Sequence, residues 1–194
     1  ITSDGGLDFS ENYTNQEKLF YRLFFCEITL ALSLQKKNGI FICKFFEFNT
    51  IFTIKIIYIL YLFYDEVIIT KPNISRKANS EKYLICKNLK KEVSKKILKN
   101  FYKIIINWDD NIIDIFNFNI PNYFLDSIKI YNNIILEKQL SHFEYIYDLY
   151  TNLSKKRLYK IVIEQIKYSY NYCLQYNIPI DRENIYLNYE ISYI

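Results

Sequence analysis

The sequence has 194 residues, of which 51% are hydrophobic and 24% are charged, and its formal net charge at pH 7 is +4. This balance predicts a soluble globular chain made of one domain plus an appendage. The most apolar segment, residues 51–64, contains Lys55 and is shorter than the roughly 20 residues that cross a bilayer. The composition therefore excludes a membrane-spanning helix in this segment and predicts a buried helix instead.

The four cysteines lie far apart inside apolar runs and form no Cys-x-x-Cys pair. They predict reduced, buried thiols in an intracellular protein and exclude a zinc site or a disulfide framework. Methionine is absent even from position 1, and Ile1-Thr2-Ser3 is typical of the end of a strand. We therefore expect that an upstream part of the protein is missing from this sequence. The cysteines are Cys26, Cys43, Cys86 and Cys173.

The first long element that the pattern predicts is a helix that ends near Asn38-Gly39. Residues 14–17, Thr-Asn-Gln-Glu, have the spacing of a capping box at its start. Five residues then recur at every third or fourth position, as they would on one face of a helix. These residues are Leu19, Leu23, Cys26, Leu30 and Leu34.

Two strands and a second helix follow. The apolar run 39–44 begins at a glycine and predicts a buried strand of a parallel sheet. Thr50 is placed to cap the helix 51–64, and the β-branched residues of 66–70 predict another strand. This alternation predicts right-handed crossovers and a parallel sheet whose faces are covered by helices.

The character of the chain changes near Lys87. Residues 71–80 are a polar loop, and 83–86 form a strand that pairs most easily with 66–70 as an antiparallel hairpin. Beyond this strand the pattern is helical. We expect residues 1–90 to form an α/β domain and 91–194 to form a helical extension. Helices are predicted after Ser94, Pro121 and Ser154.

Three polar clusters can meet at one edge of the predicted sheet. Open α/β sheets bind ligands at the carboxyl ends of their strands, and Lys44 ends the strand that begins at Gly39. Ser3-Asp4-Gly5-Gly6 follows the first strand, and Asn79-Ser80-Glu81-Lys82 opens the last one. Each charged residue alone is more often a solvated strand end. Their joint occurrence favours a functional site.

Five motifs occur in order along the first 89 residues. They are Ser3-Asp4-Gly5-Gly6, Asn15-Gln16-Glu17, Phe41-Ile42-Cys43-Lys44, Lys71-Pro72 and the run from Ser75 to Lys87. With these motifs the segment resembles the FtsJ-like ribose 2'-O-methyltransferases. It is most similar to the cap-specific mRNA members of eukaryotes and large DNA viruses.

The resemblance implies a Rossmann-like methyltransferase sheet that uses S-adenosyl-L-methionine, with this chain as its carboxyl-terminal part. Asp4, Lys44 and Glu81 match the last three members of the family's Lys-Asp-Lys-Glu tetrad. Lys44 is then the proton acceptor, and the two carboxylates orient it and balance its charge. Ser3, Asp4 and Gly5 are implied to contact the cofactor. The first lysine, the glycine-rich turn and the acidic residue that hold the cofactor have no counterpart here.

The implied substrate is capped mRNA, methylated on the 2'-OH of a cap-proximal nucleotide. Ser75, Arg76 and Asn79 are implied to contact the RNA, and Glu11 and Asn12 to reach the cap or its neighbouring nucleotide. Capping-machinery proteins are implied as further partners, and no membrane is. The implied location is the cytoplasm, or the viral factory of a virus, with the nucleus as the alternative.

Two other functions stay open from the sequence. One is methylation of ribosomal or transfer RNA on the same fold, and the other is a catalytically silent RNA-binding or scaffold subunit. His142 and Trp108 are interpreted as structural residues. If the tetrad assignment holds, the carboxylates of Asp4 and Glu81 are expected within about 4 to 6 Å of the Lys44 ammonium, the range in which charges shift pKa values.

Overall fold

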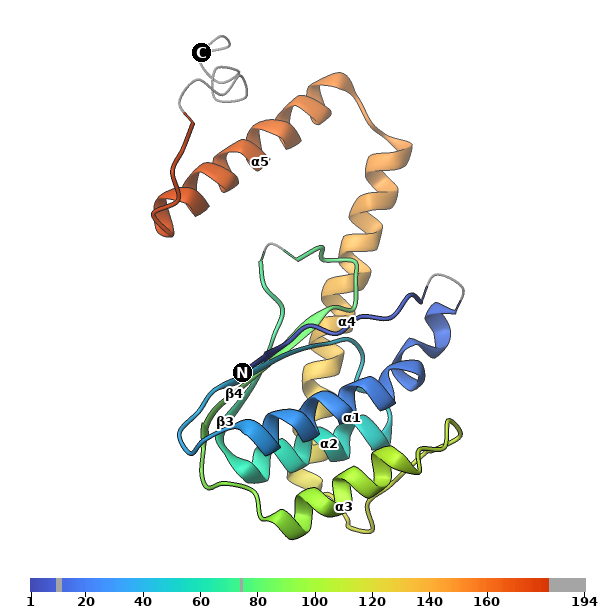
Figure 1. Cartoon of the computed structure of the whole chain (residues 1–194). Coiled ribbons are helices and arrows are strands. Elements are labelled where there is room, and N and C mark those ends of the chain that lie inside the picture. The colour runs from blue at the N-terminus through green and yellow to red at the C-terminus, as the bar shows by residue number, and fades with distance from the viewer. Residues whose placement is uncertain (10–11, 74, 182–194) are drawn as a thin grey trace. The chain divides into compact units, whose positions relative to one another are not determined.

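The computed structural model describes residues 1–9, 12–73 and 75–181. Within these residues a four-stranded sheet is combined with helices, as Figure 1 shows. The elements are β1 (Thr2–Ser3), the 3-10 helix η1 (Tyr13–Asn15), α1 (Gln16–Leu34), β2 (Phe41–Phe45), α2 (Ile51–Phe63), β3 (Tyr64–Thr70), β4 (Lys82–Leu89), α3 (Lys95–Ile106), α4 (Asn122–Thr151) and α5 (Lys155–Gln175).

The sheet has the strand order β1-β2-β4-β3. β1 is parallel to β2, and β4 is antiparallel to β3, so both of these predicted pairings are confirmed. Because β4 lies between β2 and β3 and is antiparallel to both, β1, β2 and β3 all run in one direction and β4 runs against them. As a result, the carboxyl ends of β1, β2 and β3 and the amino end of β4 share one edge of the sheet.

The helix predicted after residue 14 exists, but its first turn is built differently. Its N-cap is Asn15, and no capping box forms. The Glu17 carboxylate accepts hydrogen bonds from the backbone N–H groups of Asn49 and Thr50, at 3.2 and 3.0 Å, and from the Thr50 hydroxyl at 2.7 Å. The acidic side chain therefore ties α1 to the start of α2 instead of capping its own helix.

The leucine stripe confirms that α1 is a helix, but it is not the most buried face of this helix. Leu19, Leu30 and Leu34 are 49%, 52% and 72% exposed, whereas the helix is buried through its aromatic side chains. Aromatic residues bury more area than leucine, so they occupy the side that faces the sheet. The buried apolar residues of α1 are Phe20, Tyr21, Phe24, Phe25, Ile28, Ala31 and Leu32.

The two faces of the sheet differ in their surroundings. Along β2, Phe41, Cys43 and Phe45 are buried, whereas Ile42 and Lys44 between them are only half-buried. Successive side chains of a strand point to opposite faces, so one face forms the core and the other carries Lys44. On the core face α1 and α2 lie next to each other, and α3 packs against α1 (Figure 1).

The later helices begin where the sequence predicts. The hydroxyls of Thr50, Ser94 and Ser154 each accept a hydrogen bond from a backbone N–H in the first turn of α2, α3 and α5. Trp108 lies against Phe25 and Phe52, with ring centroids 6.1 and 6.0 Å apart, which fits its interpretation as a structural residue.

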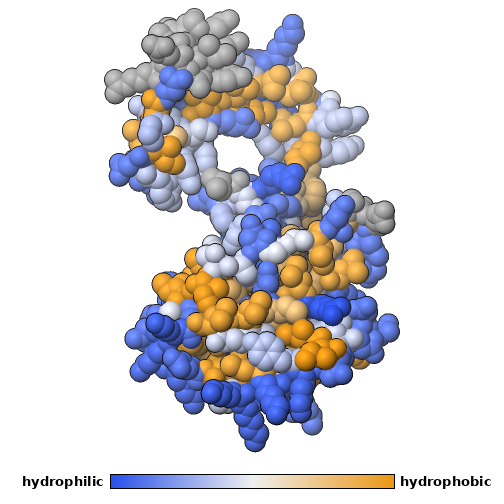
Figure 2. All heavy atoms as spheres, viewed as in Figure 1, coloured by the Kyte–Doolittle hydropathy of each residue, from blue (hydrophilic) through white to orange (hydrophobic). Residues whose placement is uncertain are grey.

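The chain divides into two compact units, residues 1–140 and 141–194. The first unit holds the sheet, α1 to α3 and most of α4, while the predicted domain boundary at residue 90 stays a prediction. In the second unit Arg157 pairs with Asp148, and the rings of His142 and Tyr145 stack 5.8 Å apart. No residue of α5 is buried, and Figure 2 shows apolar side chains at the surface of this unit.

All four cysteines are free, as predicted, although only Cys43 and Cys86 are buried; Cys26 and Cys173 are half-buried. Burial raises the pKa of the Cys43 and Cys86 thiols, so both stay protonated at neutral pH. In the part of the chain that the structure describes, no helix combines the length and the apolar character needed to cross a bilayer.

Candidate active site

The register of the strands brings the predicted catalytic residues to one edge of the sheet. Ser3 pairs with Cys43, so the residues that follow them, Asp4 and Lys44, are neighbours. Lys44 in turn lies opposite Tyr83, and Glu81 precedes that strand by one residue. The pairing pattern alone therefore assembles Asp4, Lys44 and Glu81 on the half-buried face.

Asp4 and Lys44 form a direct ion pair. The lysine side chain is 19% exposed and the aspartate side chain 73% exposed, so the pair lies at the rim of the sheet. The hydrogen bond to Asp4 raises the pKa of Lys44, and this effect outweighs the lowering by desolvation. Lys44 is therefore an ammonium ion at neutral pH in this structure.

Glu81 lies farther from Lys44 than Asp4 does. Its Oε1 atom accepts hydrogen bonds from the Ser75 hydroxyl at 3.3 Å and the Tyr83 hydroxyl at 3.4 Å. No ion pair joins Glu81 to Lys44 within the described residues, although its charge contributes to the raised pKa of Lys44. The expected approach to Lys44 is confirmed for Asp4, whereas Glu81 acts on Lys44 through the electric field.

Lys71 organises the loop beside the site, a role that its place in the Lys71-Pro72 motif did not reveal. It directly follows β3, much as Lys44 lies next to the end of β2. Its ammonium donates to the backbone carbonyls of Asn79 and Glu81 at 2.9 and 3.0 Å. It also donates to Asn79 Oδ1 at 2.6 Å and to the Ser75 hydroxyl at 3.4 Å. Desolvation lowers the pKa of Lys71. The rule that selected Lys44, a charged residue closing an apolar strand, also identifies this lysine.

This loop encloses a cleft of about 290 Å³ next to Glu81. Three predicted RNA contacts, Ser75, Arg76 and Asn79, line it together with Glu81 and Tyr83, and Pro72 completes the wall. Arg76 is exposed, so its guanidinium is available to a ligand. The structure thus brings the three predicted substrate residues together with one of the predicted catalytic residues, Glu81.

Asn12 does not line this cleft. Its side-chain oxygen accepts a hydrogen bond from the backbone N–H of Asn15 at 3.3 Å and caps η1. Its predicted contact with the cap stays a prediction. Glu11, proposed with it, lies outside the described residues.

The turn after β1 is held by a carboxylate on α1. Glu27 Oε1 accepts a hydrogen bond from the Gly5 N–H at 2.8 Å, and the Cys43 thiol donates to Oε2 at 3.5 Å. A Cβ atom at Gly5 would lie 2.4 Å from Glu27 Oε1, so a larger residue would push the carboxylate away. Burial raises the pKa of Glu27 above its usual value. Glycine at this position therefore keeps Asp4 close to Lys44.

The same turn was predicted to contact the cofactor, and its surroundings fit one wall of such a site. The Asp4 carboxylate is exposed, and a Cβ atom at Gly6 would meet no heavy atom within 4 Å. An open surface beside a carboxylate suits a ligand with a positive charge, such as the sulfonium of S-adenosylmethionine. Ser3 ends β1 directly before this turn. Among the described residues no cluster of acidic, cysteine or histidine side chains could hold a metal ion.

Comparison with known proteins identifies the segment that carries this edge. Residues 1–89 match the FtsJ-like methyltransferase family. The chain is 30% identical over 178 residues to the cap-specific mRNA (nucleoside-2'-O-)-methyltransferase 1 of Drosophila melanogaster, covering 84% of this chain and 22% of the fly protein. It is 40% identical over 90 residues to the human protein of the same name, covering 46% of this chain and 11% of that protein.

A third relative is the cap-specific mRNA (nucleoside-2'-O-)-methyltransferase 1A of Caenorhabditis briggsae, which is 36% identical over 103 residues. That match covers 53% of this chain and 12% of the nematode protein. The chain thus spans between about a tenth and a fifth of the length of these relatives. The matched segment contains β1 to β4, the Asp4–Lys44 pair and the cleft beside Glu81. Residues 1–89 thus match an FtsJ-like methyltransferase domain, and this match implies S-adenosylmethionine as the methyl donor.

Proposed function

We propose that this chain is part of an mRNA cap ribose 2'-O-methyltransferase that methylates the 2'-OH of a cap-proximal nucleotide. The observation that carries the proposal is the Asp4–Lys44 ion pair at the carboxyl edge of the sheet, next to the cleft that Glu81 lines. The names of the relatives support capped mRNA as the substrate.

Methylation of a ribose hydroxyl requires the oxygen to lose its proton as the new O–C bond forms. When bound, S-adenosylmethionine supplies an electrophilic methyl group on a sulfonium. Lys44 is the group placed to hold the hydroxyl by a hydrogen bond and to receive its proton, provided that the lysine is neutral when the hydroxyl binds. Asp4 fixes the position of the Lys44 amine, and Glu81 adds negative charge that stabilises the ammonium formed by proton transfer.

The raised pKa of Lys44 limits this step. A base with a pKa above the working pH is mostly protonated, so only a small fraction of the molecules is ready to accept a proton. A substrate that covers the site removes water from Lys44 and lowers its pKa by desolvation, in the direction opposite to Asp4. Substrate binding and base activation are therefore coupled at this lysine.

The cleft beside Glu81 suits a nucleotide of the RNA chain. Its Arg76 guanidinium can bind a phosphate, while the Ser75 hydroxyl and the Asn79 amide offer donors and acceptors to sugar or base. Lys71 fixes the backbone on which Asn79 and Glu81 lie. The loop is thus pre-organised before RNA binds.

The test replaces Lys44 with alanine in the complete protein and measures methyl transfer to capped RNA. Loss of a general acid or base typically costs about 10²- to 10⁴-fold in rate. RNA affinity should stay close to that of the unchanged protein. Lys87→Ala is the matched control, because Lys87 pairs with Glu66 at 3.0 Å on β3 and touches none of the site residues. Near-normal transfer by the Lys44 variant would leave this lysine without a catalytic role.

Substrate choice is tested with the same preparation. Capped mRNA should accept the methyl group, whereas uncapped ribosomal or transfer RNA should not. Transfer to uncapped RNA alone would point to the other ribose methyltransferases. RNA binding without transfer to any of these substrates would indicate a silent subunit.

A further inference from the structure

A second pocket lies on the opposite side of the segment that carries Glu81. Asn79 and Glu81 line the cleft described above, whereas Ser80 and Lys82 line the second pocket. This alternation follows from the extended backbone, in which neighbouring side chains point to opposite sides. One short segment therefore forms a wall of both cavities.

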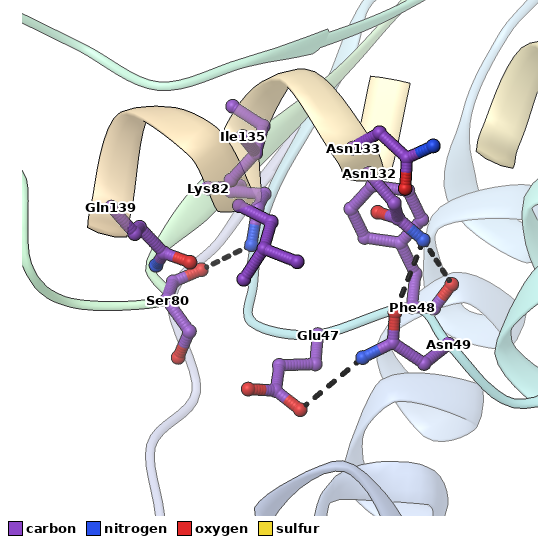
Figure 3. Close-up of a pocket in the computed structure, with 10 residues that line it drawn as sticks. Glu47, Phe48, Asn49, Ser80, Lys82, Asn132, Asn133, Ile135 and Gln139 are labelled. Carbon is purple, nitrogen blue, oxygen red and sulfur yellow. Dashed lines mark hydrogen bonds between the residues drawn. The ribbon is translucent and has the colours of Figure 1, made fainter. Parts of the chain in front are cut away.

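Three parts of the first unit build the second pocket, which has a volume of about 230 Å³ (Figure 3). They are the loop after β2, the start of β4 and the middle of α4. Pockets for drug-sized ligands typically measure about 300 to 1,000 Å³, so this smaller one suits a single ring system. Its lining consists of Glu47, Phe48, Asn49, Ser80, Lys82, Asn132, Asn133, Ile135, Leu136 and Gln139.

Lys82 is the buried donor of this pocket. The residue is only 4% exposed, and its ammonium donates to the carbonyls of Phe46 at 3.0 Å and Ser80 at 2.8 Å. A lysine ammonium has three protons, so these two carbonyls leave one donor for a ligand. The Phe48 ring lies 5.4 Å from the Lys82 nitrogen and gives the pocket an apolar wall.

Glu47 is the acceptor at the exposed rim. Its carboxylate accepts a hydrogen bond from the Asn49 amide at 3.5 Å, which is at the weak limit for such a bond. Within the described residues no ion pair joins Glu47 to Lys82. The Glu47 carboxylate can therefore accept further hydrogen bonds and the Lys82 ammonium can donate one, although the two line the same pocket.

Two amides of α4 are held in place around this pair. Asn132 donates to the Phe48 carbonyl at 3.4 Å and to Asn49 Oδ1 at 3.1 Å, as the dashed lines in Figure 3 mark. Gln139 donates to the backbone carbonyl of Asn79 at 3.0 Å. These bonds fix the amides, so the polar groups of the pocket are pre-organised for a ligand.

The lining argues against two simple ligands. A phosphate would meet the Glu47 carboxylate, and the single free proton of Lys82 is too little to balance its charge. A metal ion would find one carboxylate and a nearby ammonium, which is a poor donor set for a hard cation. A neutral molecule with donors and acceptors on one edge fits better.

We propose that this pocket binds a guanine base of the RNA chain. On its pairing edge guanine presents two adjacent donors, N1–H and the N2 amino group, beside the acceptor O6. The donors match the two oxygens of the Glu47 carboxylate, and O6 matches the free proton of Lys82. Adenine lacks the O6 acceptor, and uracil offers a single N–H donor, so neither satisfies both groups.

The guanine lies near the methylated nucleotide because alternate residues of the segment 79–82 line the two cavities. That it belongs to the RNA substrate rests on the proposed function, whereas the pocket and its base preference do not. A 7-methylguanine carries a positive charge on the ring, which is unfavourable beside the buried Lys82 ammonium. The pocket is therefore assigned to an unmodified guanine of the chain rather than to the methylated cap base.

The first experiment titrates the 194-residue chain with nucleosides and follows the side-chain amide signals of Asn132 and Gln139 by NMR. Guanosine should shift them in a saturable way. Inosine, which lacks the N2 amino group, should bind about tenfold more weakly, the effect expected for one hydrogen bond to a charged group. Adenosine should cause no saturable shift. Equal binding of guanosine and adenosine, or no shift with guanosine, would overturn the proposal.

Glu47→Gln is the decisive variant, because Glu47 is exposed and its replacement leaves the core unchanged. It should weaken guanosine binding at least tenfold and remove most of the difference from inosine. Glu137→Gln is the matched control, an exposed residue of α4 outside the pocket, and should bind guanosine normally. Unchanged binding by Glu47→Gln would contradict the assigned contact.

Two further measurements distinguish a failure of the pocket proposal from a failure of the proposed function. Binding of 7-methylguanosine as tight as that of guanosine would make this a cap pocket and overturn the assignment to the RNA chain. Lys44→Ala should bind guanosine normally while losing methyl transfer. If guanosine fails to bind while the Lys44 variant still loses transfer, the pocket proposal fails and the proposed function stands.

Discussion

Asp4 has two opposing effects on the lysine beside it. The ion pair fixes the Lys44 amine at the sheet edge, which favours proton transfer in a defined direction. The same contact raises the pKa of Lys44 and keeps it protonated, which disfavours its use as a base. Asp4 thus lowers the fraction of Lys44 that is neutral, but it holds the Lys44 amine in a more precise position.

Asp4→Asn should separate these two effects in the pH dependence of methyl transfer. Without the carboxylate the pKa of Lys44 falls, so the rate should begin to rise at a lower pH. The maximal rate should also fall, because the amine loses its anchor. The pH–rate profile of the complete protein, measured beside Glu66→Gln as control, tests this. A midpoint that does not move would show that Lys44 is not the titrating base.

Lys82 makes the stability of the protein depend on pH in an unusual direction. Desolvation lowers the pKa of Lys82 to about 8 from the ordinary value of 10.5, with a further lowering by Lys71 and opposite contributions from Glu47 and Glu17. Between these two pH values the unfolded chain binds more protons at this group than the folded chain does. The contribution of Lys82 to stability therefore rises as the pH increases through this window.

Lys82→Met removes this titration while keeping an unbranched side chain. The free energy of unfolding of the unchanged protein, minus that of the variant, should grow between pH 7 and pH 10 by up to about 3 kcal/mol. Taking the difference cancels the contributions of buried thiols and tyrosines, which have the opposite sign. Urea unfolding at a series of pH values measures it. A difference that stays constant with pH would place the Lys82 ammonium in contact with water.

Among the elements, α1 shows what a periodic sequence pattern can and cannot predict about a helix. Two apolar stripes run along this helix, and helical spacing alone does not say which one is buried. Three of the five residues of the leucine stripe are exposed, whereas the aromatic stripe packs on the sheet, with Phe24 stacked on Phe45 at a ring distance of 6.0 Å. The existence of the helix follows from local periodicity, but its orientation depends on the shape of the partner surface.

Because one face of α1 is buried and the other exposed, two substitutions in this helix should differ strongly in their effect on the free energy of unfolding. Phe24→Ala should lower the free energy of unfolding by about 3 to 5 kcal/mol, because Phe24 is buried and its removal leaves a cavity. Leu30→Ala should change it by less than about 1 kcal/mol, because Leu30 is 52% exposed. Chemical denaturation of both variants gives the comparison. Similar losses would mean that the leucine stripe contacts a further part of the protein.

For the strands too, the local sequence predicts that a strand forms but not all of the strands with which it pairs. Alternating side chains predict β4, and its position directly after β3 in the order of strands favours antiparallel pairing of the two. The insertion of β4 between β2 and β3 requires pairing across some forty residues, which no local pattern encodes. The Asp4–Lys44 pair was predictable from residue types at strand ends, whereas the Lys71 network depends on how the following loop folds back.

At the scale of the whole molecule, β4 joins two halves of the sheet. It forms one ladder with β2 and another with β3, and these two strands do not pair with each other. A chain that ends at residue 81 should therefore leave both strands with unpaired edges, which favour association between molecules. Such a truncated chain should be recovered mainly as aggregate, whereas a chain ending at residue 140 should stay soluble, as size-exclusion chromatography can measure. A soluble monomer from the shorter chain would contradict this role of β4.

The central place of β4 also sets an order of events during synthesis. A ribosome adds about 5 to 20 residues per second, so β1, β2 and β3 leave it before the strand that connects them is available. Glu81 and the floor of both cavities arrive with that same strand. The nascent chain therefore has to wait for residues 82–89 before it can close its sheet, and an unfinished protein carries Lys44 without its assembled neighbours. The sheet and the edge that carries Asp4, Lys44 and Glu81 are therefore completed together.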